Sequence, residues 1–158
     1  MLGGRSALAS VFLCFVCLLG PTPPAAGICT TDLPRQVKSM IKIAPRLNHL
    51  GSRLYTQTAT DFQNCIVSTL KCFSAEMDVL INEWKLAKTH NVKIPQKKTL
   101  VSGLKRLADR FSLAKNTTTS ECRQCERLQQ KDAEEFLREL EGTLEKINSA
   151  PCPPEDST

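Results

Sequence analysis

The sequence predicts an all-α protein, a four-helix bundle with up-up-down-down topology that disulfide bonds stabilise. Apolar residues recur at intervals of three and four in four separate stretches, and no stretch makes a convincing strand. Eight cysteines are present, and six of them follow an apolar N-terminal segment, as in secreted disulfide-bonded domains. The connections between the four stretches differ in length, which permits the long crossovers that this topology needs.

Residues 1–27 have the features of a secretory signal peptide. Arg5 precedes an uncharged apolar run that ends at Leu19, and small residues occupy the cleavage-site positions before Ile28. The run is too short to span the roughly 30 Å of bilayer hydrocarbon as a helix, so an uncleaved membrane anchor is the less favoured alternative. We therefore expect secretion of one domain, residues 28–158, that ends in a short proline-rich tail.

The first predicted helix covers residues 33–50. Asp32 can cap its N-terminus, and Pro45 is expected to kink or shorten its C-terminal end. Its spacing indicates one apolar stripe, made of Leu33, Val37, Met40, Ala44 and Leu47. A loop over residues 51–60 follows.

The second predicted helix, residues 61–88, has the clearest pattern. Its apolar residues alternate between steps of four and three, which predicts a continuous stripe facing the core. The stripe comprises Ile66, Leu70, Phe73, Met77, Leu80 and Trp84. A turn over residues 90–96 contains Pro95, which ends any helix before it.

The third and fourth predicted helices cover residues 97–115 and 131–148. Gly103 lowers the stability of the third helix, and a polar connection, residues 116–130, separates the two. Acidic residues in the first turns of the fourth helix suit the positive end of its dipole. The two apolar stripes comprise Leu100, Leu104, Leu107 and Phe111, and then Ala133, Phe136, Leu137, Leu140, Leu144 and Ile147.

Four helices with one apolar face each can bury those faces only around a shared core. The short connection after the second helix predicts that the second and third helices are antiparallel neighbours. The two longer connections permit crossovers, which gives the up-up-down-down arrangement.

The cysteine spacing restricts the disulfide pairing. Cys65 and Cys72 lie about 10.5 Å apart on one helix, too far for a disulfide between them. Cys122 and Cys125 can pair locally, but two parallel bridges, Cys65–Cys122 and Cys72–Cys125, use the four cysteines better. Each bridge closes a long loop and contributes about 4 kcal/mol in the chain-entropy model.

The two remaining cysteines, Cys29 and Cys152, flank the first and last helices, whose outer ends meet in this topology. We expect a third bridge, Cys29–Cys152, at that end of the bundle. The alternative for the other four cysteines is a zinc site, but cysteines seven apart on a helix are a poor half-site, and secretion favours oxidation.

Composition argues against catalysis and nucleic-acid binding. The formal net charge is +5, the basic residues are scattered, and the chain has one Trp and one Tyr. Neither His49 nor His90 has a plausible nucleophile and acid beside it, and no phosphate loop, metal-ligand helix or cofactor motif is present. A secreted helical protein that binds lipid or membranes is the alternative function, but the apolar stripes leave no wide spare apolar face.

Several motifs resemble those of the interleukin-15 family of cytokines. Residues 65–73 have the pattern C-x6-C-F, residues 122–128 have C-x-x-C-E-x-L, and Glu-Phe-Leu follows at 135–137. Asn116 begins a glycosylation sequon before the second motif, as in that family. The resemblance covers residues 55–148 and implies a short-chain helical cytokine with the same two parallel bridges. Cys29 and Cys152 depart from the family pattern and indicate a paralogue.

A second stripe of the second helix carries Cys65, Cys72, Glu76, Val79 and Glu83, rotated about 100° from the core stripe. A bridge from Cys72 to Cys125 would place Glu126 beside Glu76. On the residues alone, a solvated helix face is the preferred interpretation. The resemblance implies instead that an alpha-type receptor binds the face formed by Tyr55, Glu76, Val79, Glu83 and Glu126.

The resemblance also implies signalling through beta and common-gamma receptor chains, by a monomer or a complex with the alpha-type chain. Where the family has an aspartate on its first helix, this chain has a basic helix with Arg35 and Lys42. Where the last helix of the family offers a glutamine to the gamma chain, ungapped counting places Glu145.

Overall fold

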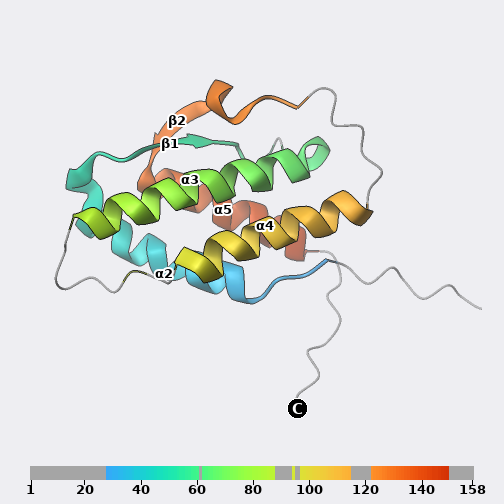
Figure 1. Ribbon diagram of the computed structural model, residues 1–158, viewed down its shortest axis with the longest axis horizontal. Helices are drawn as coiled ribbons and strands as arrows, with labels where there is room; N and C mark the ends of the chain where they lie inside the picture. Colours follow the sequence, from blue (N-terminus) through green and yellow to red (C-terminus); the bar gives the residue numbers. More distant parts are fainter. Residues whose placement is uncertain (1–27, 61, 88–93, 95–96, 115–121, 150–158) are drawn as a thin grey trace, which may run out of the picture.

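The computed structural model describes residues 28–60, 62–87, 94, 97–114 and 122–149 (Figure 1). In this part of the chain the α-helices are α2 (Asp32–Leu47), α3 (Ile66–Leu86), α4 (Lys97–Ala114) and α5 (Ala133–Asn148). Two short strands also form, β1 (Arg53–Thr56) and β2 (Gln129–Asp132). Single 3-10 turns occur at η1 (Asn48–Leu50), η2 (Phe62–Asn64) and η3 (Cys125–Arg127).

The four helices form an up-up-down-down bundle. Figure 1 shows α2 and α3 running in one direction and α4 and α5 running in the other. The most extensive contacts join α3 to α4 and α2 to α5, with a smaller contact between α2 and α4. The predicted antiparallel pairing of the second and third helices is therefore confirmed.

The core is built from the predicted apolar stripes. Every predicted stripe residue of α2, α3 and α5 is buried, and Phe111 of α4 packs against the core while partly exposed. The rings of Phe73 and Phe136 meet at the centre, with centroids 5.4 Å apart and planes inclined at 56°. The burial of Val67 and Ile81 makes the core-facing side of α3 wider than the single stripe that we predicted.

Helix ends differ from the predictions by a few residues. The expected cap by Asp32 is wrong: the helix begins at this residue, and no side chain caps it. At the other end α2 stops two residues after Pro45, because proline removes a backbone donor, and the chain continues as η1 into Gly51 at φ 66°. Helix α3 begins at Ile66 rather than residue 61, because η2 occupies part of that interval.

The prediction that the chain contains no strand is wrong. β1 and β2 pair in antiparallel register, with Arg53 opposite Asp132 and Thr56 opposite Gln129. The guanidinium of Arg53 also donates a hydrogen bond to the carbonyl oxygen of Gln130 at 2.8 Å. The ribbon therefore fastens together the two crossover connections, which lie 77 residues apart along the chain at this bond.

Hydrogen bonds also fasten the crossover and the N-terminus to α5. The N–H of Ala59 donates to Glu139 Oε2 at 2.8 Å, and Lys146 Nζ donates to the carbonyl oxygen of Ala59 at 2.6 Å. Thr30 donates its N–H to Asn148 Oδ1 at 2.9 Å and accepts from Asn148 Nδ2 at 2.6 Å. The residue after Cys29 is thus held at the C-terminal end of the last helix.

Candidate functional site

Two disulfide bonds attach the second crossover to the side of α3. Cys65 is bonded to Cys122 and Cys72 to Cys125, with Cα–Cα distances of 5.7 Å and 5.4 Å. These are the two parallel bridges predicted from the sequence. Because all four thiols are oxidised, the alternative zinc site is excluded.

The bridge between Cys72 and Cys125 assembles the acidic face, a name we use for Tyr55, Glu76, Val79, Glu83 and Glu126. Tyr55 comes from β1 and Glu126 from η3, while the other three project from successive turns of α3. The backbone N–H of Tyr55 donates to Glu76 Oε2 at 2.9 Å, which ties the strand to the helix. Val79 is 44% exposed and forms the apolar centre of the face. The structure therefore brings together the residues that the resemblance singled out.

The pKa of Glu76 reflects its burial and the other carboxylates of the acidic face. Partial burial raises the pKa of its carboxyl, and repulsion from Glu126 and Glu83 raises it further, while the hydrogen bond from Tyr55 acts in the opposite direction. Glu126 and Glu83 therefore both lie close enough to Glu76 to repel its carboxylate. Such a cluster favours a partner with basic side chains, which would relieve the repulsion.

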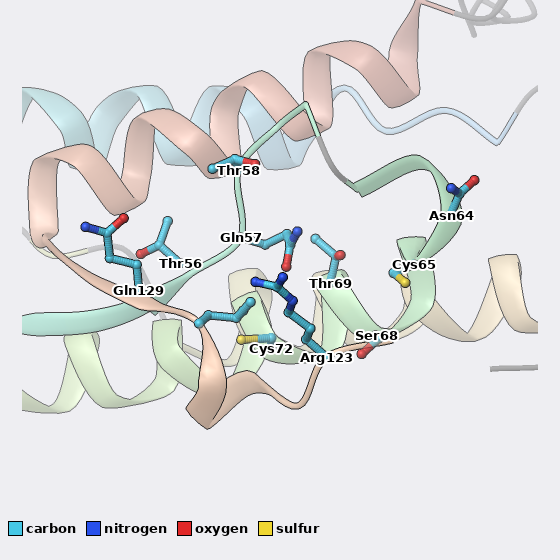
Figure 2. Close-up of a pocket in the computed structure, with 11 residues that line it drawn as sticks. Thr56, Gln57, Thr58, Asn64, Cys65, Ser68, Thr69, Cys72, Arg123 and Gln129 are labelled. Atoms are coloured by element: carbon cyan, nitrogen blue, oxygen red, sulfur yellow. The ribbon is translucent and has the colours of Figure 1, made fainter. Parts of the chain in front are cut away.

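A polar cavity of about 610 Å³ lies next to the acidic face, between the loop after β1, the start of α3 and the second crossover (Figure 2). Hydroxyl and amide side chains line much of it, including Ser68, Thr69, Gln57 and Asn64. Arg123 projects into it from the crossover. The cavity could not be predicted from the sequence, because its walls come from three segments that only folding and the two bridges bring together.

Glu145, the candidate contact for a signalling chain, lies on α5, where this helix packs against α2. Its carboxylate pairs with Lys38 Nζ at 3.4 Å, and Glu141 pairs with the same ammonium at 3.6 Å. The side chain of Glu145 is 57% exposed, so it can reach a partner. Lys38 belongs to the basic first helix, and the pairing was not foreseen from the sequence.

Other predicted positions lie outside the described residues, namely the signal peptide, the Asn116 sequon, His90 and Cys152. The Cys29–Cys152 bridge therefore stays a prediction, which the attachment of Thr30 to Asn148 supports. His49 is exposed at the end of η1. None of the described helices combines the length and apolar character that a membrane-spanning segment needs.

Comparison with known proteins adds independent information. The sequence model of the family described as Interleukin 15 matches residues 11–147. The interleukin-15 proteins of Ovis aries and Bos taurus are 34% and 31% identical to this chain over 91 residues. Those matches cover 57% of this chain and 51% of either relative, so the aligned part spans about half the length of these proteins.

A longer alignment extends over most of the domain. Interleukin-15 of Homo sapiens is 27% identical over 144 residues, which cover 79% of this chain and 83% of the human protein. The family match includes all four helices of the bundle up to Ile147 and both disulfide bridges. On these grounds the chain belongs to the interleukin-15 family.

Proposed function

We propose that this protein is a secreted cytokine that binds an alpha-type receptor chain through the acidic face. The observation that carries the proposal is the convergence of Glu76, Glu83 and Glu126 around exposed Val79 on a molecule with a net charge of +5. A partner with a basic surface gains attraction and speed of association from such a local reversal of charge. The matching positions of the interleukin-15 family support the same partner.

A double charge reversal, Glu76→Lys with Glu83→Lys, tests the proposal. The affinity for an alpha-type receptor ectodomain, measured by surface plasmon resonance, is expected to fall at least about 100-fold, because two favourable charge contacts become repulsive. The matched control is Asp78→Lys with Asp109→Lys, two carboxylates that border a groove between α3 and α4. An unchanged affinity in the first variant, with both bridges intact, would refute the proposal.

The signalling chains, of the beta and common-gamma type, are proposed to bind the side of the bundle formed by α2 and α5. Glu145 is exposed on α5 beside Lys38 of α2, whereas the acidic face is built from β1, α3 and η3, so the two kinds of partner would use different elements. Glu145→Lys is expected to lower signalling in a reporter cell line without changing the affinity for the alpha-type chain. Equal losses in both assays would show that Glu145 has no separate signalling role.

A lipid-binding role is the weaker alternative. Among the described residues, the large apolar side chains that are exposed are Val79, Leu86 and Leu113. They lie on two helices and do not form one continuous stripe. A membrane surface is normally bound by a wide apolar face, which these three residues do not supply.

A further inference from the structure

The polar cavity has a rigid wall. Cys65 and Cys72 line it, and their bridges fix the second crossover across α3. Its shape therefore depends on two covalent bonds as well as on loop packing. A preformed cavity of this kind can bind a group of a partner with little loss of conformational entropy.

One charged side chain lines the cavity in the part of the chain that the structure describes. Arg123 is the only charged side chain among the described residues of its lining. Figure 2 shows its guanidinium directed into the cavity, with Gln57 and Thr69 beside it. Thr69 lines the cavity although it is only 3% exposed. A guanidinium offers five N–H donors and no acceptor, and a carboxylate is the group that matches its fork.

The cavity and the acidic face share an edge. Cys72 lines the cavity and lies one helical turn before Glu76, and Thr56 lines it directly after Tyr55. A protein bound to the acidic face would therefore lie next to the cavity. The combined surface presents carboxylates on α3 and η3 and, in the lining of the cavity, the guanidinium of Arg123.

We propose that the cavity receives an acidic side chain, an aspartate or glutamate, from the same protein partner whose basic residues pair with the acidic face. The inference rests on the proposed function and adds a contact of opposite sign to it. A surface that carries both positive and negative charges fixes the orientation of a partner, and it disfavours partners whose surface is uniformly basic. Arg123 is thus a residue that determines specificity.

The sign of a mutational effect provides the test. Arg123→Glu makes this region more negative, so general attraction to a basic partner predicts tighter binding. Loss of a specific carboxylate contact predicts weaker binding instead, and we expect at least about a 30-fold loss of affinity for the alpha-type ectodomain. Arg123→Lys keeps the positive charge but removes the planar guanidinium that can donate two parallel hydrogen bonds to a carboxylate. This variant should therefore show an intermediate loss of affinity.

Arg127→Glu is the matched control. Arg127 is exposed, lies four residues further along the same segment and does not line the cavity. This variant makes the same change of charge and should bind as tightly as the parent or more tightly. Equal or tighter binding by Arg123→Glu would overturn the inference. Peptide mapping of both bridges and melting temperatures would establish that each variant is folded.

Two further measurements separate this inference from the proposed function. If the Glu76→Lys, Glu83→Lys variant loses binding while Arg123→Glu does not, only the cavity contact is wrong. If neither variant loses binding, the proposed function fails as well. Finally, reversing one acidic residue of the ectodomain to arginine should restore at least about tenfold of the binding lost by Arg123→Glu, and failure of every such reversal would contradict the contact.

Discussion

At the scale of single residues, Glu76 links the fold to the proposed function. Its carboxylate accepts the N–H of Tyr55, so it anchors β1, and it also forms part of the acidic face. Burial raises its pKa, and two neighbouring carboxylates add to that effect. A carboxyl whose pKa is higher in the folded chain than in the unfolded chain binds its proton more tightly when folded. The ionised form therefore costs stability at neutral pH, and the cost disappears on acidification.

Glu76→Gln tests this reasoning. The amide oxygen can still accept the N–H of Tyr55, while the cost of a half-buried charge is removed. The melting temperature of the variant at neutral pH should equal or exceed that of the parent, and the difference should shrink as pH falls towards the ordinary carboxyl pKa of about 4.3. A variant that melts well below the parent at neutral pH would show that the charge itself stabilises the fold.

At the scale of elements, helix contacts explain the two helical glycines. A Cβ on Gly103 of α4 would come within 2.5 Å of the Leu33 side chain on α2, whereas a Cβ on Gly142 of α5 would meet Ala59 at 3.4 Å. From the sequence, Gly103 could be recognised only as a residue that weakens its helix. The structure adds that this position lets two helices approach closely.

The two positions should respond differently to alanine. Gly142→Ala is expected to stabilise the protein by about 0.5–1 kcal/mol, because alanine favours the helix and the added methyl group makes an ordinary contact. Gly103→Ala should give a smaller gain or none, since the Leu33 side chain must move. Denaturant unfolding of both variants measures the difference, and a larger gain at Gly103 would contradict the packing described here.

The two bridges have similar spans but different neighbours. They join residues 57 and 53 positions apart, so removal of either should cost about 4 kcal/mol in the chain-entropy model. Only the bridge between Cys72 and Cys125 contains the residue next to Glu126. Paired Cys→Ser changes at 72 and 125 should therefore weaken alpha-type binding more than those at 65 and 122, although thermal unfolding shifts equally. Equal losses of affinity would show that the second bridge does not position the acidic face.

The sequence predicted the helices and their buried stripes because apolar residues that repeat with the 3.6-residue period of a helix mark its buried face. It did not reveal the β-ribbon, since β2 has no apolar alternation and pairs through its backbone with a distant segment. The glutamates of the acidic face could be named from the family resemblance. Arg123 could not be placed, because its surroundings depend on two bridges and on the path of the first crossover.

At the scale of the whole molecule, charge is distributed unevenly. Exposed Arg35, Lys42 and Arg46 make α2 basic, while the acidic face lies on α3 and the second crossover. Figure 1 shows α2 and the β-ribbon on opposite sides of the bundle. Such a separation of charge orients approaching partners and leaves room for two of them at once. The proposal of an alpha-type chain on one side and signalling chains on the other depends on this arrangement.

Hydrogen–deuterium exchange of the secreted protein, free and bound to an alpha-type receptor ectodomain, can locate the surface that this receptor chain binds. We expect slower exchange on binding in β1, in the part of α3 around Glu76 and Glu83, and in the segment from Cys122 to Gln129. Exchange along α2 and along the α2-facing side of α5 should stay unchanged. Protection confined to α2 and α5, with none at the acidic face, would contradict the account.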